Sequence, residues 1–382
     1  MSNETTVNAL PEKVAAALER VEKYYVGIVP WFANVFDPKT GGFYMTVSGA
    51  KDPEMAPAIE MTCWGVNFLK TYTRAFETMP DKFRDGIIKF MNDRQDPETG
   101  MYIDFQGPVN PRETARNQGA ALRALDHFGA DTRYPHPRRM GASAGKTPVM
   151  PEYMDSVDSY MAWVTEKNWD HASWGAGDQT QSSLQYVNML EPERREKYVE
   201  ALFKFLDERQ QESGLWATDM DFNAASGAFK VGLVYATCGR RLPNPEKIVD
   251  AIFECYRVSK TSNPFFVRNP ISVLHQMSTY SPELKKKIQD GIVENIDAVV
   301  ESFGEFLCPD GAFSARKGKS MLAFGGVVGS HELFEGDIDA TLMMLIARRT
   351  LYNIFDTEAP YFDTTDFWAW IYGEKEMPSI GE

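Results

Sequence analysis

The chain has 382 residues, of which 43% are hydrophobic and 13% aromatic, and this is ample for a large core. A formal net charge of −14 argues against a basic surface that would bind nucleic acid. Because no run of 18 apolar residues occurs and the first residues lack a basic region followed by an apolar run, we expect neither a membrane span nor a signal peptide.

The cysteine pattern indicates no special chemistry. Cys63, Cys238, Cys255 and Cys308 form no Cys-x-x-Cys pair, and none lies with a histidine at zinc spacing. We expect reduced, mostly buried thiols in a cytoplasmic protein.

A repeated turn divides the chain into units. Each copy has a small polar residue, then glycine, one residue and an aromatic side chain, and the clearest copies lie at 37–44, 96–103, 211–217 and 309–313. Their glycines, which can take positive φ and end a helix, are Gly41, Gly100, Gly214 and Gly311. The aromatic residue is expected to cover the helix end. Degenerate copies at 169–174 and 262–266 complete six units of about 50 to 57 residues, a period typical of stacked repeats.

Each unit is predicted to be a helical hairpin. The first helices, which begin with proline and acidic residues and are amphipathic, are expected at 12–36, 80–95, 151–167, 193–211, 244–258 and 283–305. The second helices, richer in Gly, Ala, Met and Leu, are expected at 56–78, 111–128, 176–190, 223–238, 268–280 and 336–355. In the last of these, residues 340–347 are apolar on every side, as in a fully enclosed helix.

This alternation predicts an all-α fold, an (α/α)6 toroid in which the first helices form an outer ring and the second helices an inner ring. We expect one domain over residues 1–382. Residues 129–150 break the period and are expected to form an inserted surface loop or lid. The aromatic C-terminal tail, residues 356–382, is expected to pack across the ring as a cap.

The Gly-x-aromatic turns and the acidic run at 337–341 resemble the terpenoid cyclase and protein prenyltransferase toroid superfamily, over most of the chain as architecture. Class II terpenoid cyclases use such a run to protonate an alkene. Asp337 and Asp339 match the two spaced acids, whereas the family's additional adjacent Asp is Ala340 here. Carbohydrate-active toroids, among them uronate hydrolases, sugar 2-epimerases and helical polysaccharide lyases, are similar in the ring and differ in chemistry.

The toroid places all inner-helix amino termini on one face, which becomes a cup of backbone N–H groups and first-turn side chains. Asp337, Asp339, His331 and, from another inner helix, Asp178 are the catalytic candidates, because paired carboxylates near a histidine can serve acid–base chemistry. The alternative for the two spaced acids is an ordinary helix cap. For His331 the alternative is a local hydrogen bond in a loop.

The substrate-binding candidates combine cations, an amide and aromatic rings. They are Arg116, Asn117, Lys230, Arg268, Trp174, Trp216 and Tyr102. The pair Arg116–Asn117 resembles the Asn and Arg that neutralise a uronate in helical polysaccharide lyases, although a buried arginine paired across the ring remains open. The aromatic residues can also be helix-end covers. No ligand cluster indicates a metal, and no cofactor is expected.

The mixed polar and aromatic cup favours an enzyme that uses acid–base chemistry on a polar, anionic carbohydrate, as a lyase, hydrolase or epimerase. One alternative is a terpenoid cyclase-like or prenyl-handling enzyme with Asp337 or Asp339 as general acid, and another is a non-catalytic ligand-binding or scaffold toroid. We expect a small-molecule or oligosaccharide substrate, with neither nucleic acid nor membrane as partner. The sequence sets no oligomeric state.

Overall fold

The computed structural model describes residues 10–104, 111–140 and 150–378. Over these residues the chain is mostly helical, with two short antiparallel ribbons, β1–β2 (Phe36–Asp37 and Gly42–Phe43) and β3–β4 (Ala323–Phe324 and Val327–Val328). The expected all-α class is therefore confirmed. None of the described helices combines the length and the apolar character that a membrane crossing requires.

The chain groups into two compact units, and each unit is assembled from three stretches. Unit 1 comprises Met1–Glu22, Pro148–Glu305 and Ile346–Ala359, and unit 2 comprises Lys23–Thr147, Phe306–Leu345 and Pro360–Glu382. The prediction of a single toroidal domain stays a prediction.

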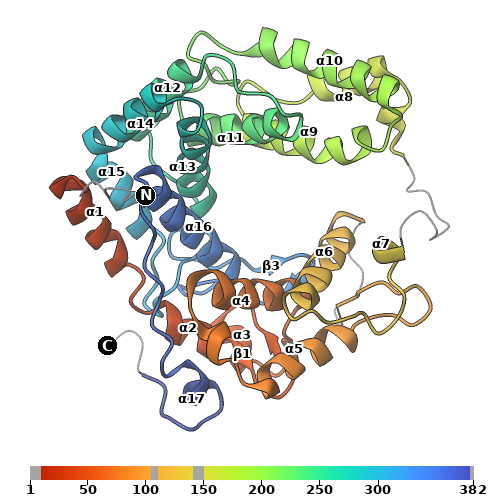
Figure 1. The fold of residues 1–382 in the computed structure, drawn as a ribbon, viewed down its shortest axis with the longest axis vertical. Coiled ribbons are helices and arrows are strands. Elements are labelled where there is room, and N and C mark those ends of the chain that lie inside the picture. The colour runs from red at the N-terminus through yellow and green to blue at the C-terminus, as the bar shows by residue number, and fades with distance from the viewer. Residues whose placement is uncertain (1–9, 105–110, 141–149, 379–382) are drawn as a thin grey trace, which may run out of the picture. The chain divides into compact units, whose positions relative to one another are not determined.

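Unit 1 consists of two layers of helices. Its helices are α1 (Glu12–Lys23), the 3-10 turn η3 (Glu152–Met154), α8 (Val157–Thr165), α9 (Ser173–Val187), α10 (Pro192–Arg209), α11 (Phe222–Thr237), α12 (Pro245–Val258), α13 (Pro264–Ser278), α14 (Pro282–Glu294), α15 (Ile296–Gly304) and the second half of α16 (Ile338–Ile354). The second helices α9, α11 and α13 pack side by side, while α10 packs on α8 and α14 on α12 (Figure 1). Within this unit the expected second helices thus pack on one another, while the expected outer and inner rings stay a prediction.

The amino-acid composition of the helices explains which of them have one buried face and which are buried on several sides. Helix α12 begins with proline at its first position and buries one stripe that includes Ile248, Ile252 and Cys255, as an amphipathic surface helix does. Helix α11 buries most of its residues, many of them Gly or Ala, so its neighbours can approach from several sides.

Helix α1 contacts residues of α14 and α15, which lie about 280 positions later in the chain. Lys13 Nζ donates to the Val293 carbonyl at 2.8 Å, and Arg20 pairs with Asp297 at 2.6 Å. These contacts bring the first helix of the chain against the last helices of unit 1.

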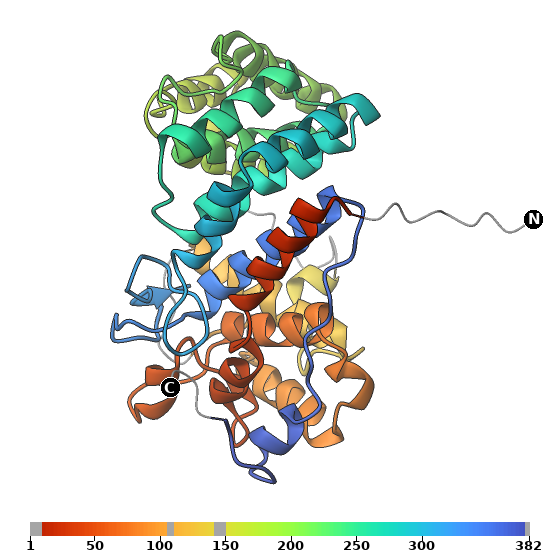
Figure 2. The same cartoon turned by 90° about the vertical axis from the view of Figure 1, so that its left-hand side faces the viewer.

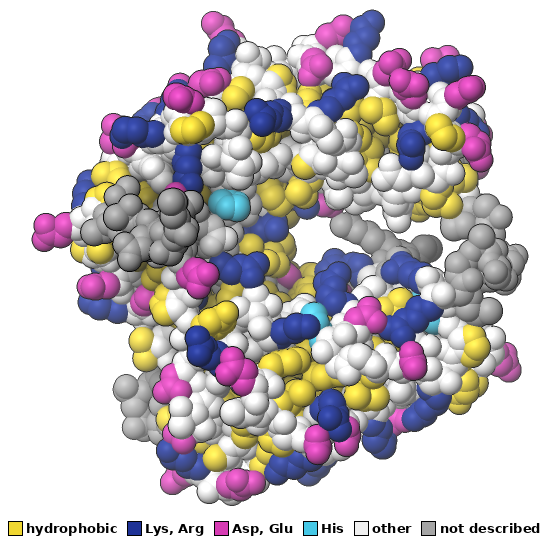
Figure 3. Space-filling model, in the orientation of Figure 1, with side chains coloured by type: hydrophobic (Ala, Val, Ile, Leu, Met, Phe, Trp, Pro, Cys, Tyr) yellow, Lys and Arg dark blue, Asp and Glu magenta, His cyan; other side chains and the backbone are white. Residues whose placement is uncertain are grey.

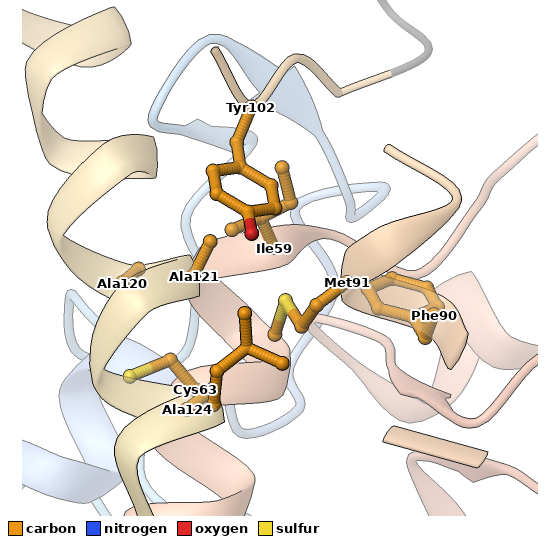
Figure 4. Close-up of a cluster of buried hydrophobic side chains, with 9 residues drawn as sticks. Ile59, Cys63, Phe90, Met91, Tyr102, Ala120, Ala121 and Ala124 are labelled. Carbon is orange, nitrogen blue, oxygen red and sulfur yellow. The ribbon is translucent and has the colours of Figure 1, made fainter. Parts of the chain in front are cut away.

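Unit 2 contains both ribbons, β1–β2 and β3–β4, and several short helices. Its helical elements are α2 (Ile28–Asn34), α3 (Val47–Lys51), α4 (Ile59–Tyr72), the 3-10 turn η1 (Ala75–Thr78), α5 (Asp81–Asn92), α6 (Pro111–His127), α7 (Pro137–Met140), the first half of α16 and α17 (Phe367–Ile371). Helix α6 packs on α4 and α5. One core cluster between these helices gathers Ile59, Phe90, Met91 and Tyr102 with small residues of α6 (Figure 4).

The repeated turn has the predicted geometry. Gly41, Gly100, Gly214 and Gly311 all have positive φ, between 68° and 90°. The aromatic residues that follow them are fully buried, namely Phe43, Tyr102, Trp216 and Phe313. In this respect the sequence interpretation is confirmed.

Unit 2 adds a hydrogen bond that the sequence pattern did not predict. In the three turns at Gly41, Gly100 and Gly311, the amide of the turn aromatic donates to a side-chain oxygen of the next long helix, α4, α6 or α16. The pairs are Phe43 N to Thr62 Oγ1 (2.9 Å), Tyr102 N to Gln118 Oε1 (2.6 Å) and Phe313 N to Thr341 Oγ1 (3.1 Å). Each turn is thereby tied to the helix that follows it.

Four predicted helices are interrupted. The helix expected at 56–78 is α4 and η1, and the helix expected at 151–167 is η3 and α8. The helix expected at 12–36 is α1 and α2, because the chain bends at Gly27, where a Cβ would come within 2.7 Å of the Gly311 Cα. Pro30, in the first turn of α2, also lacks the N–H that a continuous helix would need. The helix expected at 283–305 is α14 and α15, which meet at Asn295, whose side chain donates to the Gly291 carbonyl.

The insertion and the tail both pack on unit 2. In the insertion, His136 is 1% exposed and its ring stacks on Tyr102, while residues 141–149 lie outside the described part. The tail runs along unit 2 to α17, which contacts α2 (Figure 2). Phe362 N donates to the Tyr72 carbonyl at the carboxyl end of α4, so this part of the tail lies at the opposite end of α4 from its amino terminus.

The surface carries charges of both signs. Figure 3 shows Lys and Arg side chains interspersed with Asp and Glu side chains over both units on the face in view.

We expect Gly41→Ala to lower the free energy of unfolding by about 2 kcal/mol or more. The left-handed conformation costs a residue with a Cβ roughly 1–2 kcal/mol, and a Cβ at Gly41 would also meet the Gly86 carbonyl oxygen at 2.3 Å. Gly129→Ala is the matched control, because Gly129 has φ +62° with nothing within 4 Å of the added atom. Urea unfolding measures both variants. Equal losses would show that the contact with Gly86 is unimportant.

Candidate functional site

The amino-terminal ends of α9, α11 and α13 form the richest polar cluster of unit 1. Asp221 caps α11 by accepting from the Ala224 amide at 2.8 Å, and Asn263 caps α13 by accepting from the Phe266 amide at 3.2 Å. Such caps fix where each helix begins and hence where its first-turn side chains lie.

The charged part of this cluster joins α9, α11 and α13, and Lys230 lies in the middle of α11. Lys230 Nζ donates to Asp178 Oδ1 at 2.7 Å, and both side chains are largely shielded, with exposed fractions of 18% and 24%. The Arg268 guanidinium lies 4.4 Å from the centroid of the Phe229 ring. Helices α9 and α11 approach closely here, since a Cβ at Gly177 would come within 2.8 Å of the Lys230 Cβ. The Lys230 ammonium lies 5.8 Å from the centroid of the same ring, so an ammonium with its carboxylate partner and a guanidinium both lie near Phe229.

An aromatic group adjoins these charges. The Trp174 ring lies 5.6 Å from the Phe265 ring and 5.5 Å from the Phe266 ring, measured between centroids. Asn223 of α11 accepts from the Trp174 amide at 3.3 Å, which links this group to the start of α11. Trp174 is partly exposed, so one aromatic surface of the cluster remains accessible.

Several buried polar atoms of the same helix ends have no hydrogen-bond partner among the described residues. They are Trp174 Nε1, Ser173 Oγ, Ser226 Oγ and Asn269 Nδ2. The last three belong to side chains that are fully buried. Buried polar groups in native proteins are nearly always satisfied, so a concentration of unsatisfied donors favours a bound ligand or water there.

Four sequence candidates therefore come together in unit 1, namely Asp178, Lys230, Arg268 and Trp174. Trp216 does not join them. Its side chain is fully buried, and its Nε1 donates to the Leu206 carbonyl of α10 at 2.7 Å. It lies inside the core behind the turn.

A second, smaller cluster lies in unit 2 at the amino-terminal end of α4. Arg116 donates to Glu60 Oε1 through Nη2 at 2.7 Å and through Nε at 3.1 Å. The guanidinium also lies 4.2 Å from the Phe324 ring, which in turn lies 4.9 Å from the Trp64 ring. The Arg116 guanidinium thus already contacts a carboxylate and an aromatic ring of the same chain. Asn117, its neighbour, is 5% exposed, and its Oδ1 has no partner among the described residues.

Asp337 is fully buried and organises the backbone. Its Oδ1 accepts from the Ala340 amide at 2.9 Å and so caps α16. Its Oδ2 accepts from the amides of Ala315 and Met321 at 2.9 and 3.1 Å. Burial raises the pKa of this carboxyl to about 6, against the lowering effect of these three hydrogen bonds. All of these contacts are those of a cap and loop anchor.

The other two acidic-run candidates lie on opposite sides of this anchor in the sequence. Asp339, in the first turn of α16, is 2% exposed. His331 is exposed, and its Nε2 lies 2.9 Å from Asp52 Oδ2. This partner is distant in sequence and differs from the local loop hydrogen bond that was the alternative, so the catalytic role of His331 stays a prediction.

Tyr102 belongs to the core of unit 2. Its ring lies over Ile59 and against the alanines of α6 (Figure 4), and its side chain is fully buried. Burial raises its pKa to about 12, and its hydroxyl has no partner among the described residues.

The described residues contain no group of three or more His, Cys, Asp or Glu side chains that could hold a metal ion. The four cysteines are free thiols, and Cys63, Cys255 and Cys308 are buried, as expected.

No family model, no curated protein and no solved structure matches this chain.

Two functional elements were missed by sequence reasoning. The ribbon β3–β4 brings Phe324 onto Arg116, and its signal was the pair Gly325–Gly326 between short apolar runs, which is typical of a tight hairpin. Phe229, beneath Arg268, carries no separate signal, because it is one apolar residue of a mostly apolar helix.

Tyr102→Phe is expected to leave the free energy of unfolding unchanged or to raise it by up to about 1 kcal/mol, because it removes a buried hydroxyl that lacks a partner. If Tyr102 instead bound the substrate, the same replacement would weaken ligand binding. Thermal unfolding with and without ligand measures both quantities. If Tyr102→Phe lowered ligand affinity and left the free energy of unfolding unchanged, Tyr102 would be a substrate-binding residue after all.

Proposed function

We propose that this chain is an enzyme that acts on an anionic carbohydrate by acid–base chemistry, as a lyase, hydrolase or epimerase. The proposed site is the cluster at the amino-terminal ends of α9, α11 and α13. We also propose a cytoplasmic location and the closure of the six hairpins into an (α/α)6 toroid. The two-layer packing of unit 1 and the repeated turn of unit 2 support this closure.

The observation that carries the proposal is the set of buried, unpartnered donors beside the Lys230–Asp178 pair. Trp174 Nε1 and Asn269 Nδ2 are donors without an acceptor, and Ser226 contributes a hydroxyl. A ligand that satisfies them must be rich in acceptor oxygens, as hydroxyl groups and carboxylates are. Arg268 and Lys230 add cationic donors, which favour a carboxylate among those oxygens.

The Lys230–Asp178 pair supplies the proposed proton transfers. A carboxylate can remove a proton from a carbon or a water, and an ammonium can deliver one to a leaving oxygen. Their direct contact keeps both groups in one geometry. The Trp174 ring offers an apolar face against which the C–H face of a sugar ring can lie.

The prenyl-handling alternative has less support. It requires Asp337 or Asp339 as proton donor, and the raised pKa of Asp337 is the observation in its favour. Both carboxylate oxygens of Asp337, however, already accept backbone N–H groups. We therefore place the proposed chemistry at Asp178 and Lys230.

A thermal-shift panel tests the proposal. The ligands are glucuronate, galacturonate and trigalacturonate, with glucose, galactose and maltotriose as neutral counterparts and farnesyl diphosphate as the isoprenoid. We expect at least one uronate, and not its neutral counterpart, to raise the melting temperature, since a ligand of the native state must stabilise it. Arg268→Met should abolish that rise.

Positive hits are then assayed for turnover by the appearance of an unsaturated, hydrolysed or epimerised product. Binding without turnover would support the non-catalytic binding protein. A shift with farnesyl diphosphate alone would overturn the carbohydrate proposal.

A further inference from the structure

A pocket of about 750 Å³ lies in unit 2, away from the sequence candidates. It is formed between the segment after α4, residues 74–78, and the tail, residues 361–368. Its volume is within the usual range for small-molecule sites, about 300–1,000 Å³. Its polar and aromatic lining includes Arg74, Glu77, Thr78, Tyr361, Asp363, Thr365 and Trp368.

The tail wall of the pocket is fixed by the core. On the tail side, Phe362 N donates to the Tyr72 carbonyl at 3.0 Å, and the Phe362 ring lies 6.0 Å from the Phe68 ring. The Trp368 ring packs edge-on against Phe83 at 4.9 Å. The pocket is therefore preformed, which reduces the entropic cost of binding.

Aromatic rings face the pocket from one segment of the tail. Tyr361 is 53% exposed, so a large part of its ring is open to a ligand. The Arg74 guanidinium lies 5.3 Å from its centroid and holds the ring in place. Trp368 Nε1 donates to Thr78 Oγ1 at 3.2 Å and thereby spans the two walls. An accessible aromatic ring beside polar groups suits a ligand with both apolar faces and hydroxyls.

The polar groups of the pocket do not favour an anion. Glu77 and Asp363 outnumber the single guanidinium of Arg74. Asp363 is held ionised, because the amide and hydroxyl of Thr365 donate to it at 2.9 and 2.7 Å and lower its pKa. Carboxylates and threonine hydroxyls accept hydrogen bonds from sugar hydroxyls, whereas a uronate would be repelled here.

We propose that this pocket is a second carbohydrate-binding site, which takes a neutral oligosaccharide with a sugar ring stacked on Tyr361. The proposal goes beyond the function proposed for unit 1 and does not depend on it. A neutral site in one unit and a site for anions in the other fit a protein that holds a mixed polysaccharide.

Isothermal titration with cellohexaose, maltohexaose, xylohexaose and mannohexaose tests this site, with hexagalacturonate as the anionic comparison. We expect the wild-type chain to bind at least one of the four neutral hexasaccharides with a Kd of 10 mM or lower. Tyr361→Ala should weaken that binding by about tenfold or more. Tyr361→Phe keeps the ring and should bind as the wild type does.

Two controls separate the sites. Phe334→Ala removes an exposed aromatic ring of unit 2 outside the pocket and should leave the Kd unchanged. Lys230→Met should also leave it unchanged, although it disables the proposed site of unit 1. Failure of all four neutral sugars to bind, or equal affinity of Tyr361→Ala and wild type, would overturn the proposal.

Discussion

Replacing Lys230 by methionine is expected to lower kcat/KM on the anionic substrate by about 10²- to 10⁴-fold, the usual contribution of a positioned acid or base. The loss has a specific cause. Lys230 is a partner of Asp178, with 2.7 Å between Nζ and Oδ1, so the change removes one proton-transfer group and also takes this contact from the other. Methionine keeps most of the length and the apolar character of the lysine stem, so little packing is lost. The measurement is steady-state kinetics on the uronate identified by the thermal-shift panel.

Comparison with Asp178→Asn makes this prediction sharper. If the two side chains act as one unit, each single variant and the double variant should lose similar activity, because effects within a catalytic unit are not additive. Lys286→Met is the matched control, since Lys286 also pairs with a carboxylate, Asp290, but on the exposed face of α14. Wild-type activity in both Lys230→Met and Asp178→Asn would remove the pair from the mechanism.

Arg348→Met is expected to lower the free energy of unfolding by about 3 kcal/mol, the cost of breaking a buried ion pair. Arg348 is 1% exposed and donates through Nε and Nη2 to the two oxygens of Glu22, at 2.7 and 2.8 Å. Tyr352 Oη donates to the same carboxylate at 2.9 Å. Without the guanidinium, Glu22 keeps only this hydroxyl. Chemical denaturation measures the loss.

A double variant and a surface variant serve as controls for the loss of stability in Arg348→Met. Arg348→Met with Glu22→Leu should recover much of the stability, because two apolar partners leave no uncompensated charge. Arg257→Met breaks the exposed pair with Glu254 and should cost less than about 1 kcal/mol. A loss of that small size in Arg348→Met would show that the pair contributes no more than a surface contact.

The helices and turns could be predicted because their signals are local. Glycine followed by an aromatic residue indicated the left-handed turns at Gly41, Gly100, Gly214 and Gly311, and all four have positive φ. The bend at Gly27 could not be predicted in this way, because its cause is Gly311, which is distant in sequence. The local sequence pattern therefore predicts that a helix forms, whereas contacts between residues distant in sequence decide where that helix is interrupted.

The candidate site was predicted only in part for the same reason. Sequence reasoning placed Trp174, Asp178, Lys230 and Arg268 near helix starts, and the structure brings them together. It could not tell an aromatic residue that faces the core, such as Trp216, from one that borders a site. That distinction depends on which neighbouring helix supplies an acceptor, here the Leu206 carbonyl.

The contact of α1 with residues that are synthesised much later has a consequence for biosynthesis. Lys13 and its partner Val293 are separated by 280 residues, which at about 5–20 residues per second corresponds to roughly 14 to 56 s of translation. During that interval the apolar stripe of α1, with Val14 and Val21, has emerged from the ribosome before the helices that bury it. Unit 1 is therefore completed only after nearly the whole chain has been synthesised, and chaperones that shield nascent helices should raise its yield.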